Sequence, residues 1–100
     1  MIARIWHGTT PIERSRDYLR LMREVAIPDY RSTPGNRDAR VLYREDGDVA
    51  HFVTLTFWES EEAIAAFAGD DVTLAKYYDF DAEYLLAKEH RVTHHQVYDG

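Results

Sequence analysis

The sequence predicts a single α+β domain, residues 1–100, in which two helical segments cover one four-stranded antiparallel sheet. One hundred residues, 45% of them hydrophobic, suffice for one modest core and are too few for two domains. Strand-like and helix-like hydrophobic periods follow one another in the order βαββαβ. The link Asp46-Gly47-Asp48 joins two of the strand patterns as in a hairpin. Together these observations predict the fold class.

The first half of the chain predicts a strand, a helix and a loop. Ile2–Gly8 is short, rich in β-branched and aromatic residues, and ends at a glycine, which favours a strand. Thr10-Pro11-Ile12-Glu13 has the pattern of a helix-starting capping box with proline at the first helical position. Apolar residues then recur at helical spacing, at Tyr18, Leu21, Met22 and Val25. Pro28 is expected to end the helix near Ala26, and Pro28–Asp38 is expected to be a loop.

The middle of the chain predicts a hairpin followed by a second helix. Ala39–Glu45 and Val49–Trp58 have strand composition on either side of the tight link. Ser60, followed by two glutamates, is typical of a helix start, because acidic side chains favour the positive end of the helix dipole. Gly69 is placed to end this helix.

The last third of the chain predicts short helical pieces and a closing strand. Asp70 or Asp71 is expected to cap a helical stretch through about Tyr78, and Ala82–Ala87 is expected to form a further turn. His90–Tyr98 is expected to be the final strand. The whole order is that of a ferredoxin-like fold, with both helices on one face of the sheet.

The strand Val49–Trp58 has two apolar faces, which indicates a partner. One face carries Val49, His51, Val53, Leu55 and Phe57, and the other carries Ala50, Phe52, Thr54, Thr56 and Trp58. Two helices can cover only one of these faces, and soluble monomers rarely expose a large apolar patch. We therefore expect a homodimer through the face that the helices leave bare.

Composition excludes several classes of function. The net charge of −6 disfavours nucleic-acid binding, which rewards basic surfaces. No apolar run approaches the roughly 18 residues of a membrane span, and the N-terminus does not resemble a signal peptide. Cysteine is absent, which excludes disulfides and thiolate metal sites and fits a cytoplasmic location. We expect no nucleic-acid or membrane partner.

Four segments stand out as a set: Thr33-Pro34-Gly35, Phe57-Trp58-Glu59-Ser60-Glu61-Glu62-Ala63, Ala66-Phe67-Ala68-Gly69-Asp70 and Val92-Thr93-His94-His95-Gln96-Val97. With these segments the chain resembles the antibiotic biosynthesis monooxygenase family of small dimeric α+β barrel proteins. The resemblance spans nearly the whole chain and implies a homodimer with one pocket per chain between sheet and helices. Haem-degrading members carry Asn, Trp and His where this sequence has His7, Phe67 and Tyr77, so all three positions depart from that branch.

The resemblance implies a candidate site in that pocket. His7 or His51 is expected to act as the base, because histidine titrates near neutrality, and Tyr77 is the third candidate catalytic residue. The candidate substrate-binding residues are Tyr30, Trp58, Phe67 and Tyr78. Each of these side chains has an ordinary structural alternative, as a core aromatic or as a hydrogen-bonded histidine.

Two further expectations concern ligands. His90, His94 and His95 have the wrong spacing on a strand for a shared metal ion, so we expect no metal site and no cofactor. Arg4 is a charge inside a strand that is otherwise apolar. It is expected either to pair with an acidic residue across the dimer or to bind an anionic substrate.

The function implied by the resemblance is a cofactor-independent monooxygenase, an oxidoreductase that acts on a small phenol- or quinol-like aromatic with O2. In that chemistry the substrate supplies the electrons, and the protein supplies a base, a dry pocket and hydrogen bonds to the developing oxyanion. The alternative is a non-catalytic homodimer that binds a small molecule or serves as an interaction module. Sequence patterns do not decide between the two, because fold does not determine function.

Overall fold

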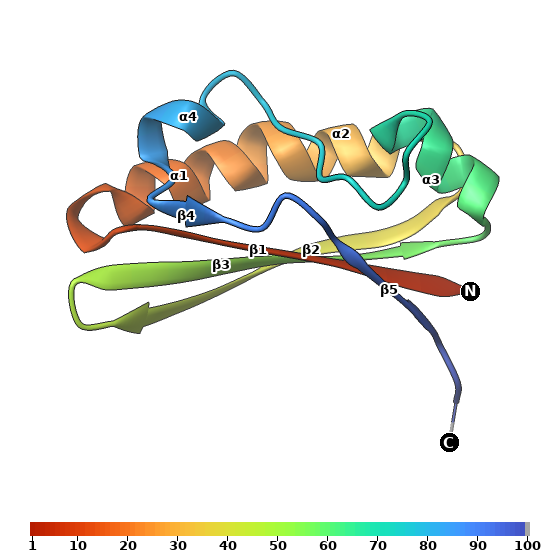
Figure 1. The fold of residues 1–100 in the computed structure, drawn as a ribbon, viewed down its shortest axis with the longest axis horizontal. Helices are drawn as coiled ribbons and strands as arrows, with labels where there is room; N and C mark the ends of the chain where they lie inside the picture. Colours follow the sequence, from red (N-terminus) through yellow and green to blue (C-terminus); the bar gives the residue numbers. More distant parts are fainter. Residues whose placement is uncertain (100) are drawn as a thin grey trace.

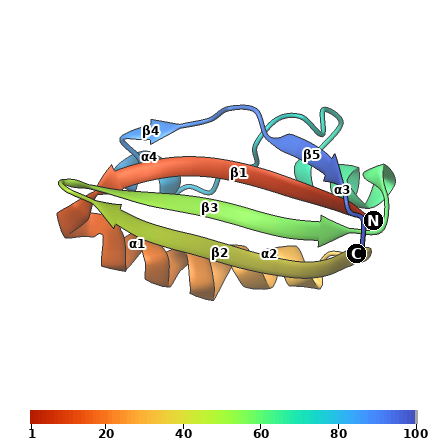
Figure 2. The same cartoon turned by 90° about the horizontal axis from the view of Figure 1, so that it is seen from below.

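The chain forms one antiparallel sheet with every helix on the same side, as the computed structural model of residues 1–99 shows (Figure 1). The long strands are β1 (Ile2–Pro11), β2 (Asn36–Asp46) and β3 (Val49–Trp58), in the order β2-β3-β1. Two short strands, β4 (Ala87–Lys88) and β5 (Thr93–Gln96), pair with the free edge of β1 (Figure 2). This antiparallel α+β architecture confirms the predicted fold class.

The first helix is longer than predicted and contains Pro28. It begins with a 3₁₀ turn at Ile12–Arg14 and continues as α1 (Ser15–Leu21), a π-helical turn (Met22–Ala26) and α2 (Ile27–Ser32). The wide π-turn directly before Pro28 relaxes the hydrogen-bond ladder where the proline ring would collide with a preceding carbonyl. The expected helix end at Ala26 and the expected loop from Pro28 are therefore wrong.

The expected capping box is also absent. β1 extends to Pro11, and the Thr10 hydroxyl donates to the Pro11 carbonyl oxygen at 3.1 Å instead of capping the helix. The second helix, in contrast, follows the prediction. α3 (Glu61–Ala68) is capped by Ser60, whose side chain accepts from the Ala63 N–H at 3.2 Å, and Gly69 ends it at a φ of 97°.

The segment after α3 is an extended coil, so the helix predicted from Asp71 to Tyr78 is wrong. The Asp71 side chain accepts from the Thr73 N–H at 3.0 Å, and the chain then runs beside the segment that leads into β5. The Ala75 N–H donates to the His90 carbonyl at 2.8 Å in that pairing. Helical structure resumes only in α4 (Asp81–Tyr84). The coil between α3 and α4 therefore lies over the helix-covered side of the sheet.

The two faces of the sheet differ in burial. On the helix side, Phe52 and Trp58 are fully buried, and they belong to an aromatic-rich core. On the opposite side, Val53, Leu55 and Phe57 remain half-exposed, and no helix covers them (Figures 1 and 2). Within residues 1–99, no helix is both long and apolar enough to span a membrane.

Candidate functional site

A small cavity lies between the sheet and the helices. Its walls come from β1, β3, the first helix and the coil Ala75–Tyr78, and its polar lining includes Arg4, Tyr30, Thr54, Lys76 and Asp81. The cavity volume is about 10 Å³, which is room for about one water molecule. A larger ligand therefore enters only if part of the wall moves. The coil Ala75–Tyr78 is the part of the wall without regular secondary structure.

Arg4 reaches this cavity from β1 and is 1% exposed. Its Nη2 donates to the Leu74 carbonyl oxygen at 2.8 Å, and its guanidinium carbon lies 5.9 Å from the centre of the Phe67 ring. Its Nε has no hydrogen-bond partner among residues 1–99. Burial lowers the pKa of Arg4, because the charged form loses its hydration. The cavity thus contains a buried cation that is only partly satisfied.

Trp6 lies two residues along the same face of β1, and its indole Nε1 is also without a hydrogen-bond partner in the described part of the chain. Its ring meets Tyr77 edge-on, with the ring centres 6.4 Å apart. The Tyr77 hydroxyl donates to the Glu89 carbonyl oxygen at 3.0 Å. Burial raises the pKa of Tyr77, and the nearby Trp6 N–H opposes that shift. Tyr77 and Trp6 therefore form one side of the cavity.

Asp81 is a buried carboxylate on the helical side of the cavity. It accepts hydrogen bonds of 2.6 Å from the Tyr18 hydroxyl and from the Tyr78 backbone N–H. Burial raises the pKa of Asp81, although both hydrogen bonds favour the ionised form and limit the shift. A carboxylate with a raised pKa in a desolvated cavity is suited to accept a proton.

Asp29 holds the coil wall in place from α2. It accepts from the Tyr78 hydroxyl at 2.6 Å and from Lys76 Nζ at 2.8 Å. Burial alone would raise the pKa of Asp29, but these two hydrogen bonds lower it overall. Lys76 Nζ also lies 4.3 Å from the centre of the Phe67 ring. These contacts close the cavity on the side of the coil.

The two histidines proposed as bases lie on the bare face of the sheet. His7 Nε2 and His51 Nδ1 share a hydrogen bond of 2.9 Å, and their rings stack with centres 5.1 Å apart. Glu89 Oε2 lies 3.1 Å from His7 Nδ1, and Asp46 Oδ2 lies 3.8 Å from His51 Nε2. The pair lines a hollow of about 280 Å³ with Leu42 and Val53. The histidines therefore form a chain of polar groups between two carboxylates.

The expectation that His7 faces the pocket beside Tyr77 is wrong. His7 shares its face of β1 with Ala3 and Ile5, as alternation requires, but the helices cover the opposite face, with Arg4 and Trp6. His51 lies on the bare face as well. A catalytic role for these histidines under the helices is not compatible with this placement.

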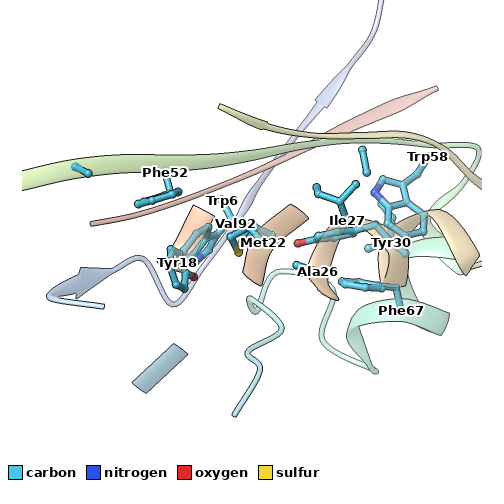
Figure 3. Close-up of a cluster of buried hydrophobic side chains, with 13 residues drawn as sticks. Trp6, Tyr18, Met22, Ala26, Ile27, Tyr30, Phe52, Trp58, Phe67 and Val92 are labelled. Carbon is cyan, nitrogen blue, oxygen red and sulfur yellow. The ribbon is translucent and has the colours of Figure 1, made fainter. Parts of the chain in front are cut away.

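The four predicted substrate-binding aromatics divide into cavity wall and core. Tyr30 and Tyr78 line the cavity. Phe67 does not line the cavity and stacks on Tyr30 with ring centres 4.3 Å apart (Figure 3). Trp58 is fully buried, and its Nε1 donates to Thr56 Oγ1 at 2.8 Å. Phe67 and Trp58 thus belong to the core.

Several cavity residues were not predicted as site residues from the sequence, among them Trp6, Tyr18 and Asp81. In the sequence Tyr18 is one of the apolar positions at helical spacing, and Asp81 falls in an Asp-rich break that normally indicates a capped turn. The alternation of β1 did hold a signal for Trp6, because it shares a face with Arg4. Among residues 1–99, no group of three or more His, Asp or Glu side chains is arranged to hold a metal ion.

Comparison with known proteins shows which solved structures share this fold. Neither a protein-family model nor a curated protein sequence matches this chain. A Nitrosomonas europaea protein provisionally assigned as an antibiotic biosynthesis monooxygenase is similar in structure, with a TM-score of 0.71, 16% identity, and coverage of 97% of this chain and 98% of that one. A crystal structure of an antibiotic biosynthesis monooxygenase gives a TM-score of 0.68 at 17% identity, over 99% of this chain and all of the other.

A mutant of MhuD, solved with two manganese protoporphyrin IX molecules in each active site, gives a TM-score of 0.61 at 21% identity, over 97% of this chain and 94% of that one. Identities this low establish the fold and do not carry over an activity. The resemblance predicted from the sequence is thereby confirmed at the level of the fold: the chain has the fold of the antibiotic biosynthesis monooxygenases over nearly its whole length.

Proposed function

We propose that the chain is a cofactor-independent monooxygenase that binds a small phenol or quinol in the cavity under the helices. The observation that carries this proposal is a desolvated cavity that combines aromatic walls with a buried carboxylate, Asp81, and a buried cation, Arg4. Pockets for small molecules typically have such apolar walls with a few convergent polar groups. The shared fold with proteins named as monooxygenases adds support by analogy.

In the proposed reaction the substrate itself supplies the electrons. Asp81 accepts the phenolic proton, because its raised pKa makes it a better base than an exposed aspartate. Arg4 stabilises the resulting anion by its charge. A ring carbon of the anion that bears hydrogen then adds O2, and the resulting peroxide anion takes back the proton held by Asp81 to form a hydroperoxide. This hydroperoxide loses water, made from its outer oxygen with the hydrogens of the hydroperoxide and of the ring carbon, and leaves a carbonyl. Tyr77 and Tyr78 provide the walls that orient the ring.

Substrate entry requires the coil Ala75–Tyr78 to move away from the sheet, because the cavity has room for only about one water molecule. The contacts of Asp29 with Lys76 and Tyr78 are the ones that must break. We expect Asp29→Asn to weaken both contacts and so to speed ligand association. Stopped-flow measurement of the fluorescence of Trp6, which lines the cavity, would record this association rate.

The chain acts as a homodimer in this proposal, and the bare face of the sheet is the interface. That face presents Val53, Leu55 and Phe57 half-exposed and Leu42 48% exposed. A second copy would cover this apolar surface, and a two-fold interface brings the same patch of each subunit together. The His7–His51 pair then lies inside the interface rather than at the cavity.

Oxygen uptake tests the proposal. Purified protein is mixed with a panel of phenols and quinols, and O2 consumption is followed with an electrode and corrected for autoxidation. We expect uptake with at least one substrate, and we expect Asp81→Asn to lose most of it. Asp79→Asn is the matched control, because Asp79 is an exposed carboxylate two residues away. Equal rates for the wild type and folded Asp81→Asn would contradict the assigned base.

A second candidate function is non-catalytic binding of a small aromatic molecule by the homodimer. Two observations favour it: the cavity is nearly filled by side chains, and both proposed histidine bases lie on the other face. The two functions are distinguished by one comparison. Binding of a phenol without O2 uptake indicates the non-catalytic function, whereas uptake in proportion to binding indicates the enzyme.

A further inference from the structure

Three buried side-chain nitrogens lack a hydrogen-bond partner within residues 1–99: Arg4 Nε, Trp6 Nε1 and His94 Nε2. The three residues are neighbours in the sheet, because Arg4 and Trp6 lie two residues apart on the same face of β1 and His94 is the cross-strand neighbour of Arg4 on β5. Buried polar groups are normally satisfied, so a cluster of exceptions calls for a physical explanation. Arg4 and Trp6 both line the cavity under the helices, where a bound ligand could accept the hydrogen bonds that they lack.

Of the three residues, Arg4 carries a buried positive charge without a negatively charged partner. No Asp or Glu of residues 1–99 forms an ion pair with it, although it is 1% exposed. A buried charge that lacks an opposite charge is costly, and it is retained where something compensates it. An acidic residue of a second copy across the bare face cannot do so, because Arg4 projects toward the helices. Of the two roles expected for Arg4, anion binding is therefore the one that its placement permits.

Trp6 adds a second hydrogen-bond donor to the lining of the same cavity. Its N–H cannot be deprotonated or act as an acceptor, so only an acceptor can satisfy it. The nearest hydroxyl, on Tyr77, already donates to the Glu89 carbonyl and forms no hydrogen bond of normal geometry with the indole. A negatively charged oxygen is the kind of atom that suits both donors, because the Arg4 guanidinium favours an anion and the Trp6 indole requires an acceptor.

We propose that Arg4 and Trp6 form an oxyanion-binding site, and that the ligand of this cavity is a small aromatic molecule bound through an anionic oxygen, as a carboxylate or a phenolate. This inference rests on the proposed function only for the choice of cavity, and it does not require reaction with O2. The aromatic part follows from the wall residues Tyr30, Tyr77 and Tyr78. A single anionic group is expected because the site holds one unpaired guanidinium.

His94 does not belong to this anion site. Its side chain lines a separate hollow with Ile2, Glu61 and Ile64. Burial lowers the pKa of His94, and the neighbouring charge of Arg4 lowers it further. A neutral His94 adds no second positive charge beside Arg4, which agrees with a site for one anionic group.

Isothermal titration calorimetry with matched ligands tests the charge requirement. Benzoate and an ionised nitrophenol represent the two sources of anionic oxygen, benzyl alcohol is the neutral counterpart, and inorganic phosphate represents an anion without a ring. We expect one or both aromatic anions to bind about ten- to a hundredfold more tightly than benzyl alcohol, which is the usual range for hydrogen bonds to charged groups. The tighter of the two aromatic anions identifies the group. Phosphate binding as tight as that of both aromatic anions would overturn the aromatic assignment.

Three variants test the residues. Arg4→Met removes the charge and Nε, Trp6→Phe removes the indole N–H, and Arg16→Met removes an equal charge from the exposed surface of the first helix. We expect Arg4→Met to bind the aromatic anion no better than benzyl alcohol, Trp6→Phe to bind it several-fold more weakly than the wild type, and Arg16→Met to bind it normally. Folding of each variant is checked by circular dichroism. If Arg4→Met does not fold, Arg4→Lys replaces it and is expected to weaken anion binding while leaving benzyl alcohol binding unchanged.

The outcomes separate this inference from the proposed function. Equal binding of benzoate, nitrophenolate and benzyl alcohol, or unchanged anion binding by folded Arg4→Met, overturns the oxyanion site whether or not O2 is consumed. Selective anion binding without O2 uptake supports the oxyanion site and contradicts only the monooxygenase proposal.

Discussion

Removal of the Tyr18 hydroxyl tests the buried polar pair at the helical side of the cavity. In the native structure this hydroxyl donates to Asp81 Oδ1 at 2.6 Å, and both residues are almost inaccessible to solvent. Tyr18→Phe leaves the carboxylate with the Tyr78 N–H as its remaining hydrogen-bond donor. A hydrogen bond to a charged group contributes about 1.5–3 kcal/mol, so the free energy of unfolding should fall by about 2 kcal/mol near neutral pH. For a domain of this size that is a decrease of about 10 °C in Tm.

The effect of Tyr18→Phe should depend on pH. Burial raises the folded-state pKa of Asp81 above its ordinary value of 3.8. Between the unfolded-state pKa of Asp81 and its higher folded-state pKa, the folded state binds more protons than the unfolded state. The contribution of Asp81 to stability is therefore fully present below the unfolded-state pKa and is lost as pH rises through the folded-state pKa. The Tyr18 hydrogen bond limits the rise, and its removal moves the folded-state pKa higher still. The destabilisation caused by Tyr18→Phe should therefore be greater at about pH 8 than at about pH 5.

Urea unfolding of the wild type, Tyr18→Phe and Tyr84→Phe at both pH values measures this prediction. Tyr84 packs beside Tyr18 with ring centres 5.7 Å apart, but its hydroxyl makes no hydrogen bond within residues 1–99. Tyr84→Phe thus removes the same atom without removing a hydrogen bond. If the two variants lose the same free energy of unfolding, or if the loss in Tyr18→Phe is independent of pH, the reasoning about Asp81 is refuted.

Three further predictions concern the interface, a turn and the histidines. Leu55→Asp, on the bare face, should give a folded monomer of 11.7 kDa in sedimentation equilibrium, whereas the wild type and the surface variant Arg16→Asp should sediment at twice that mass. Phe52 is fully buried, so Phe52→Asp should not fold, because an unpaired buried carboxylate costs several kcal/mol. Gly35→Ala should lower the free energy of unfolding by about 1–3 kcal/mol, and by more than Gly47→Ala, because both glycines have positive φ but only Gly35 would bring a Cβ into collision with Ala63. His7→Ala should leave aromatic-anion binding unchanged in calorimetry, since His7 lies on the face of the sheet opposite the cavity. Loss of binding would contradict this placement of His7.

The element order and the fold were predictable because local signals agreed with one another. β3 was predicted to the residue, since Asp46-Gly47-Asp48 marks its start and Ser60 caps the helix that follows. The end of the first helix was not predictable. Pro28 normally ends a helix, and only the π-turn that precedes it, which depends on tertiary packing, lets the helix continue. The helix expected from Asp71 is replaced by pairing with the distant segment around His90, which local periodicity cannot report.

The candidate site was predicted in part. The aromatic walls Tyr30, Tyr77 and Tyr78 and the unusual Arg4 were identified from the sequence, and the structure brings them together. The side of the sheet was misassigned for His7 because both faces of β3 are apolar enough to be buried. The buried face in fact carries Thr54 and Thr56, and Thr56 accepts the Trp58 indole N–H. The role of Asp81 was not predicted because it depends on a hydrogen bond from Tyr18, which is 63 residues away in the sequence.

The most direct test of the cavity as the ligand site uses the two tryptophans of the chain, whose indole N–H groups give two separate signals in a ¹H–¹⁵N correlation spectrum. Trp6 lines the cavity and its Nε1 has no partner in residues 1–99, whereas Trp58 Nε1 is hydrogen-bonded to Thr56 in the core. Trp6→Phe assigns the signals, and the aromatic anion that binds best is then titrated into the labelled protein. The account predicts that the Trp6 indole signal moves downfield to saturation while the Trp58 signal stays in place. A saturable shift of neither signal, or of Trp58 alone, would contradict it.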